Sequence, residues 1–332
     1  MRRGPLVALA GLAVLVPLAM LVGVAFGGAS VAPGALVHAL LHPRAGGDVA
    51  TIVWQLRIPR VAIAATVGAS LALAGALLQA LLRNPLIDPY LTGVSSGAGA
   101  SIAIAATIGL APVLIPPLGF ASGLATAVLV AVLARRGPRL DAERLILAGV
   151  SMSALLSAVV ALAIERLARG AASEAIIAWL AGSLAGRGWP ELAAAAPEAI
   201  AGAIIGAATI PALNVLRLGE GRAAALGVNV TRLQWALLIA ATLLTAAAVA
   251  LAGLIGFVGL VVPHLARRVV GPDLRLLVPG SIFAGAALVV LADALARALA
   301  APAEIPLGVL LAFIGVPTFL VLYLRGAARA YA

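Results

Sequence analysis

The sequence contains no cysteine and no lysine, and each absence excludes a class of functional site. Without cysteine the chain has no disulfide, no thiolate nucleophile and no cysteine-based metal site. All 22 basic residues are arginine. A P-loop needs its lysine on the β- and γ-phosphates of a nucleotide, so the chain carries no such ATPase motif. If this chain takes part in ATP-driven transport, the ATPase must be a separate polypeptide.

Charged residues of either sign are also scarce. They make up 10% of the 332 residues, while 64% are hydrophobic. An average soluble domain is about 25% charged and about 45–50% apolar. A soluble fold of this length could not bury so much apolar surface. The sequence therefore predicts an integral membrane protein, and its long continuous apolar runs exclude the alternating strands of an outer-membrane barrel.

Ten apolar segments predict an all-α polytopic membrane protein with ten transmembrane helices, because a span needs about 20 apolar residues. The first follows Arg2 and Arg3, as in a signal peptide, but its apolar run is too long, so we expect an uncleaved span. The eighth is too short to cross alone and predicts a half-length or tilted helix. A single permease domain covers residues 1–332, without a nucleotide-binding domain. The segments are 5–27, 52–82, 91–109, 113–134, 142–167, 190–212, 232–254, 257–269, 274–299 and 306–324.

The arginines predict the orientation of these spans. With both termini in the cytoplasm, 15 of the 22 arginines lie on the cytoplasmic side, as the positive-inside rule expects. The net charge of +10 then belongs to the cytoplasmic face, and no nucleic-acid binding is needed to explain it. The seven arginines left on the outer side are Arg44, Arg57, Arg60, Arg166, Arg169, Arg187 and Arg297.

Small residues recur within these segments at helix-packing spacing. Such pairs let two helix backbones approach closely in lipid, so they predict a tightly packed bundle. The pairs are Gly93 with Gly97, Gly119 with Gly123, and Gly202 with Gly206.

Arg57, Arg60 and Arg297 need partners, because they lie on the side that the positive-inside rule disfavours. One interpretation is an acidic protein or an anionic solute. The alternative is internal pairing with Asp293 or Glu304, or snorkelling into lipid headgroups. Asp293 and Arg297 are four residues apart on one helix face, which favours internal pairing for Arg297.

Two polar segments are predicted at the cytoplasmic side. Residues 79–89 are either a gate loop at the mouth of a pathway or a helix stop with Asn84 and Asp88 as turn formers. Residues 214–232 form a long interruption that its glycines would divide into two short helical pieces. We expect this loop to dock a cytoplasmic partner, with an idle surface loop as the alternative.

The sequence does not favour an enzyme. His264, near a helix end, is expected to be a hydrogen-bonded structural residue, and His38 and His42 lie far from it in an outer loop. No histidine cluster for a metal and no nucleophile–base constellation is visible. A channel or secondary transporter would need charged residues at mid-membrane on several spans, whereas the polar groups here lie near span ends.

Several ordered motifs between about residues 50 and 325 resemble the FecCD-type permease family, the membrane subunits of ABC importers for iron–siderophore complexes, haem and cobalamin. Each motif is weak alone, but the set is specific. A departure is Gly221, where the family more often has a polar residue. The motifs are RIPR (57–60), GALLQ (75–79), RNPL (83–86), GVSSGA (93–98), WLAGSL (179–184), LGE (218–220), LGV (226–228), GFVGL (256–260), VPH (262–264), AD (292–293) and EIPLG (304–308).

The resemblance implies a type II ABC importer permease fold and roles for individual residues. Arg57, Arg60 and Arg297 match the outer arginines that receive acidic residues of a solute-binding protein. Asn84 and Leu86 match the cytoplasmic gate. Residues 215–231 match the coupling helices that contact the ATPase, with Arg217, Gly219, Glu220, Arg222, Leu226 and Gly227 as turn or contact positions.

The resemblance also implies partners, location and cargo. A homodimer in the bacterial inner membrane would bind two copies of a cytoplasmic ABC ATPase and one periplasmic solute-binding protein. ATP and Mg would bind to the ATPase, and this chain would hold no cofactor or metal. We expect the cargo to be an iron complex, with haem favoured over a ferric siderophore. Cobalamin stays open, and an ATP-independent channel, a secondary transporter or an assembly subunit are remote alternatives.

Overall fold

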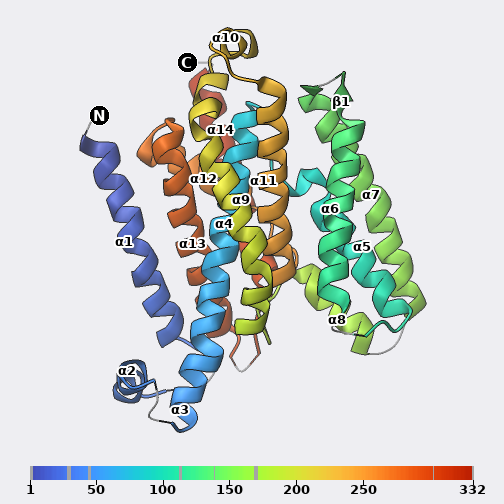
Figure 1. Cartoon of the computed structure of the whole chain (residues 1–332). Helices are drawn as coiled ribbons and strands as arrows, with labels where there is room; N and C mark the ends of the chain where they lie inside the picture. Colours follow the sequence, from blue (N-terminus) through green and yellow to red (C-terminus); the bar gives the residue numbers. More distant parts are fainter. Residues whose placement is uncertain are drawn as a thin grey trace.

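The chain is built almost entirely from helices (Figure 1). The computed structural model describes residues 3–27, 31–43, 46–111, 114–137, 139–167, 171–301 and 303–330. The elements are α1 (Arg3–Ala25), α2 (Pro33–Leu41), α3 (Asp48–Thr51), η1 (Ile52–Arg57), α4 (Ile58–Leu81), η2 (Pro89–Thr92), α5 (Val94–Thr107), α6 (Ile115–Leu133), β1 (Arg135–Arg136), β2 (Arg139–Leu140), α7 (Ala142–Leu167), α8 (Ala171–Ala181), α9 (Trp189–Leu216), α10 (Glu220–Ala225), α11 (Val230–Ala252), α12 (Val258–Val270), α13 (Leu274–Leu299) and α14 (Leu307–Ala330).

Each of the ten predicted spans has a helix at its place. Within the described residues, six helical stretches are long and apolar enough to cross a bilayer alone, and α5, α6 and α14 contribute shorter apolar helices. The tenth, α12, has 13 residues, as expected for the short eighth segment. The prediction of an all-α polytopic membrane protein is confirmed.

The short elements lie at the two ends of the bundle. Helices α2 and α3 lie at one end, and α10 lies at the other, together with the hairpin of β1 and β2 (Figure 1). In this hairpin Arg135 pairs with Leu140 and Arg136 with Arg139, in antiparallel register. Because α4 has 24 residues and a helix rises about 1.5 Å per residue, its two ends are about 36 Å apart.

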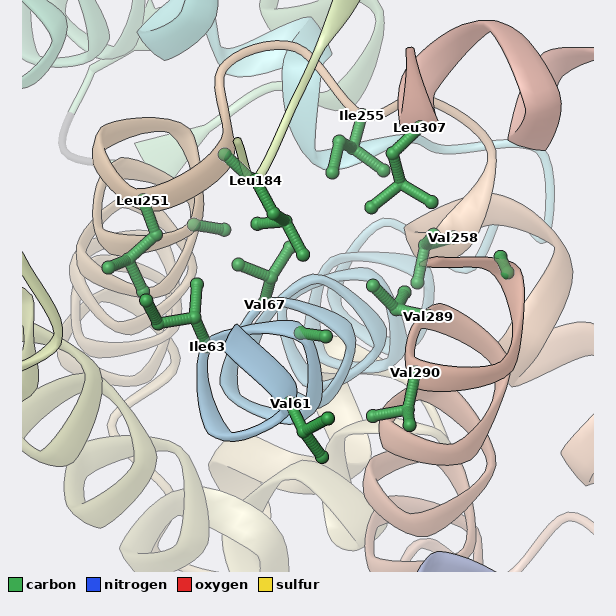
Figure 2. Close-up of a cluster of buried hydrophobic side chains, with 14 of the residues drawn as sticks. Val61, Ile63, Val67, Leu184, Leu251, Ile255, Val258, Val289, Val290 and Leu307 are labelled. Atoms are coloured by element: carbon green, nitrogen blue, oxygen red, sulfur yellow. The ribbon is translucent and has the colours of Figure 1, made fainter. Parts of the chain in front are cut away.

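Helix α4 forms the centre of the bundle, and α9, α11, α12 and α13 pack around it. Its apolar side chains are buried on several sides, as expected for a helix that is apolar all round. Val61, Ile63 and Val67 of α4 belong to one buried cluster with Leu251 of α11 and Val289 of α13 (Figure 2). The position of α4 therefore depends on contacts with its neighbours on all sides.

The small residues predicted to permit close packing do so. Gly97 and Gly123 join α5 to α6, while Gly202 contacts α11 and Gly206 contacts α4. Gly93 and Gly119 also lie against side chains of the neighbouring helix. A further close approach joins α4 to α12, since a Cβ atom at Gly75 would lie 1.9 Å from the carbonyl oxygen of Gly259.

We expect Gly75→Ala to destabilise the fold by about 3 kcal/mol, because the neighbouring backbone cannot move aside without separating α4 from α12. Thermal unfolding of the detergent-purified protein measures the change. Gly11→Ala is the matched control, since a Cβ atom at Gly11 in α1 meets no atom within 4 Å. Equal unfolding temperatures for the two variants would contradict the close approach of α4 and α12.

Candidate functional site

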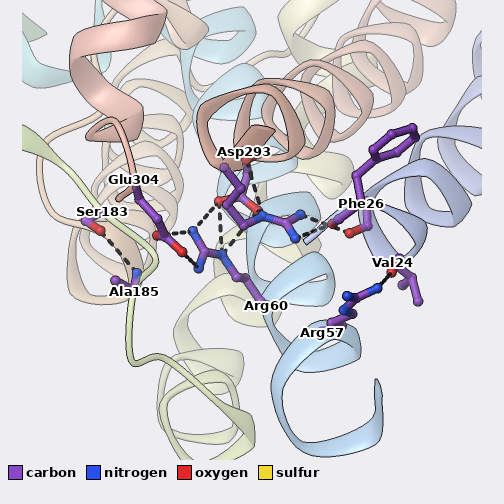
Figure 3. Close-up of polar contacts among 10 residues, drawn as sticks. Val24, Phe26, Arg57, Arg60, Ser183, Ala185, Asp293 and Glu304 are labelled. Carbon is purple, nitrogen blue, oxygen red and sulfur yellow. Dashed lines mark hydrogen bonds and ion pairs between the residues drawn. The ribbon is translucent and has the colours of Figure 1, made fainter. Parts of the chain in front are cut away.

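Arg57 and Arg60 lie together with Asp293 and Glu304 (Figure 3), at the end of the bundle that carries α2 and α3 (Figure 1). Arg297 joins them through its hydrogen bond to Asp293. We call these five residues the arginine cluster. Arg60, in the first turn of α4, lies between two carboxylates: its Nη2 donates to Asp293 Oδ1 at 2.9 Å and to Glu304 Oε2 at 2.8 Å. Its Nη1 donates to Glu304 Oε1 at 2.8 Å, so Arg60 holds Glu304 through two parallel hydrogen bonds.

The other two arginines connect the cluster to α1. Arg297 donates from Nε to Asp293 Oδ2 at 3.0 Å and from Nη2 to the carbonyl of Gly23 at 2.9 Å. It also donates to the carbonyl of Phe26. Arg57 donates from Nη1 to the carbonyls of Val24 at 2.8 Å and Ala25 at 3.0 Å. The carbonyls at the end of α1, which have no partner within their own helix, are thus satisfied by arginine side chains.

The arginine cluster divides into a buried part and an accessible part. Asp293 is 1% exposed, and the Arg57 and Arg297 residues are 5% and 4% exposed. The side chains of Arg60 and Glu304 are 15% and 33% exposed. Glu304 lies in the loop before α14, and hydrogen bonds from the Arg60 guanidinium lower the pKa of its carboxyl. Three arginines face two carboxylates, which leaves the cluster one net positive charge.

Internal pairing is confirmed for Arg297 with Asp293, and Arg60 pairs with both of the predicted carboxylates. The docking role of the three arginines stays a prediction. Of the three, Arg60 is the one with an accessible side chain, so a partner that binds here would meet Arg60 and Glu304 first.

The segment after α4 forms a tight turn. The Asn84 side-chain oxygen accepts a hydrogen bond from the backbone N–H of Leu86 at 2.9 Å. Asp88 accepts one from Tyr90 N–H at 2.9 Å and begins η2. Both residues are therefore turn formers, as one of the two interpretations predicted. Leu86 is 44% exposed, and the gate role of Asn84 and Leu86 stays a prediction.

We call residues 215–231, which the resemblance matches to the coupling helices, the coupling segment; its contact with an ATPase stays a prediction. The segment is centred on α10, at the end of the bundle opposite the arginine cluster (Figure 1). Gly219 and Gly227 have φ angles of +115° and +83°, a region that favours glycine, and they form the turns on either side of the helix. Ala223 is fully buried, whereas Leu218 and Leu226 are 56% and 66% exposed. Helix α10 is thus held against the bundle through Ala223, while the two leucines that flank it are open to a partner.

The charged residues of the coupling segment differ in their structural positions. Arg217 caps the end of α9 and donates to the carbonyl of Pro272, which fixes it to the start of α13. Glu220 is the first residue of α10, where a negative charge is favourable, and Arg222 is exposed. The prediction of two short helical pieces is wrong. The segment has one helix, because Gly221 lies within α10 and does not interrupt it.

We expected His264 to be a structural residue held by hydrogen bonds, and the structure does not show this for its Nε2 atom. This residue lies in α12, and within the described part of the chain its Nε2 atom is buried without a hydrogen-bond partner.

Comparison with known proteins assigns these features to one family. The model of the FecCD transport family matches residues 14–325. The chain belongs to the FecCD transport family. It is 40% identical over 280 residues to the cobalamin import system permease protein BtuC of Halobacterium salinarum, covering 84% of this chain and 75% of that protein. It is 38% identical over 315 residues to the hemin transport system permease protein HmuU of Yersinia pestis, covering 93% and 94%.

The three-dimensional comparison agrees. A solved structure of a metal-chelate type ABC transporter in an inward-facing conformation matches with a TM-score of 0.85 and 33% identity, covering 96% of this chain and 98% of that one. The resemblance read from the sequence motifs is therefore confirmed. As a FecCD permease, the chain is the membrane subunit of an ABC importer, and this family works with an ATPase and a substrate-binding protein.

Proposed function

We propose that this FecCD permease imports an iron complex, with haem as the favoured cargo, as a homodimer in the bacterial inner membrane. The match to the family over residues 14–325 carries this proposal. The absence of lysine supports a separate ATPase, since a P-loop cannot be formed without it. The alternating access of two such bundles would move the cargo along the dimer interface.

An apolar cavity supports haem over a hydrophilic ferric siderophore. The cavity has a volume of about 620 Å³ and lies between α5, α6, α8 and α11. Phe120 and Trp179 contribute aromatic surface, and Arg187 is the charged residue among those that line it. None of the described lining residues is acidic. A largely apolar wall with one cation suits a flat apolar ring system that carries carboxylates.

The two ends of the bundle suggest how the partners are placed. We assign the end with the arginine cluster to the outer side, where a solute-binding protein would dock, and the end with α10 to the cytoplasm, where two ATPase subunits would bind. Helix α4 links the two ends, because Arg60 lies in its first turn and the turn of Asn84 follows its last residue. This assignment follows from the distribution of arginines under the positive-inside rule.

Cobalamin is the second candidate cargo, because the Halobacterium permease of 40% identity is named for it. The experiment purifies the cognate solute-binding protein from cells supplied with both compounds and records its absorption spectrum. We expect a haem spectrum. A cobalamin spectrum would overturn the haem assignment and leave the FecCD permease assignment untouched.

A further inference from the structure

A second cavity lies at the α10 end of the bundle, and three of the nine described residues that line it are arginines. Its volume is about 320 Å³. Three arginines from three different parts of the chain line it: Arg83 after α4, Arg217 after α9 and Arg267 in α12. The remaining wall includes Gln79 and the start of α13. The fold thus brings three guanidinium groups to one hollow.

These guanidinium groups have few partners inside the protein. A guanidinium offers five N–H donors. Within the described residues, Arg83 donates to the carbonyl of Leu216 at 2.8 Å, Arg217 to that of Pro272, and Arg267 to Gln79 Oε1 at 3.4 Å. All three acceptors are neutral, so most of the donors stay available to a ligand.

None of the described residues that line the cavity is acidic. Asp293 and Glu304 pair with arginines in the arginine cluster at the other end of the bundle. Asp273 lies next to the wall residues Pro272 and Leu274, but its Oδ1 accepts from Asn214 at 3.2 Å and from the N–H of Arg275 at 3.0 Å. Arg217 lies close enough to Arg267 for their charges to repel. An anion in the cavity would relieve this repulsion.

Gln79 holds one side of the cavity in place. Its amide nitrogen donates to the carbonyls of Gly259 at 3.2 Å and Leu260 at 3.1 Å, both in α12. Its oxygen accepts from Nη2 of Arg267 at 3.4 Å. This contact orients Arg267 before any ligand binds, which lowers the entropic cost of binding.

We propose that this cavity binds a phosphate group, carried either by an anionic lipid headgroup or by free phosphate. Guanidinium groups match the geometry of phosphate oxygens and form charge-assisted hydrogen bonds with them. Basic pockets between membrane helices on the cytoplasmic side bind anionic lipid headgroups in other proteins. The proposal is independent of the cargo, since the cavity lies at the end of the bundle far from the arginine cluster.

The test uses the purified permease and has two arms. In the first, thermal unfolding is compared in nanodiscs of phosphatidylcholine with and without phosphatidylglycerol. In the second, inorganic phosphate is titrated into the protein in neutral detergent. We expect at least one arm to raise the unfolding temperature, and Arg83→Gln with Arg267→Gln to abolish that rise. Arg232→Gln removes an exposed arginine outside the cavity and should keep it.

The outcomes of the two arms distinguish a lipid headgroup from free phosphate as the source of the bound group, and they can contradict the proposal. A response to phosphatidylglycerol identifies a lipid headgroup, and a response to inorganic phosphate identifies a free anion. No response in either arm, or an equal response in the double variant and the wild type, would overturn the proposal. If the double variant does not fold, Arg267→Lys should bind phosphate about tenfold more weakly.

Discussion

Replacing Arg60 with glutamate is expected to abolish uptake and to weaken binding of the solute-binding protein by about 30-fold or more. The accessible guanidinium of the arginine cluster would become a carboxylate, which repels the acidic residues expected on the partner. Binding to the detergent-purified permease at two salt concentrations measures the loss, because the contribution of exposed charges falls with ionic strength.

The internal pairs of Arg60 make controls essential. The Arg60→Glu side chain would also face Asp293 and Glu304, so part of the loss could come from disturbed structure. A matched variant of the solute-binding protein, with lysine in place of an acidic docking residue, should restore binding to Arg60→Glu. Docking at the arginine cluster would be refuted by two results together: no lysine variant on the docking face of the solute-binding protein restores binding, and Arg60→Gln shows normal uptake.

Replacing Leu226 with aspartate is expected to uncouple the ATPase from the permease. Leu226 is 66% exposed beside α10, so the substitution should leave the fold intact. Its side chain would then place a charge in the apolar part of the expected contact, and we expect ATPase pull-down and stimulated hydrolysis to fall about tenfold or more. Co-purification and hydrolysis assays on the assembled complex measure both effects.

Leu226→Met is the matched control for this prediction, because it keeps the volume and the apolar character of the side chain. It should retain coupling. If Leu226→Asp also retains pull-down and stimulated hydrolysis, the segment from Gly219 to Gly227 is an idle loop, and the ATPase must contact the permease elsewhere.

The spans could be predicted from the sequence because each is a local property of about 20 consecutive residues. The eighth apolar segment is too short for a full span, and for this reason α12 was predicted to be a short helix. Helices α2, α3 and α8 were not predicted, because each is too short to give a signal that differs from an apolar connection. The single helix α10 was predicted as two, because a glycine is also tolerated inside a helix.

The sites were predictable only where their parts are close in sequence. The pair of Asp293 and Arg297 follows from their spacing of four residues on one helix. Arg60 lies 233 and 244 residues from its two carboxylates, so the sequence could name these partners but not choose them over a binding protein. The convergence of Arg83, Arg217 and Arg267 depends on the packing of α4, α9 and α12, which no local pattern encodes.

Haem accumulation in proteoliposomes that hold the permease, its cognate ATPase and its solute-binding protein tests the proposed function directly. We expect accumulation to require ATP and both partners, and to stop when the ATPase is omitted. Accumulation at the same rate without ATPase or ATP would contradict the assignment as an ATP-driven importer.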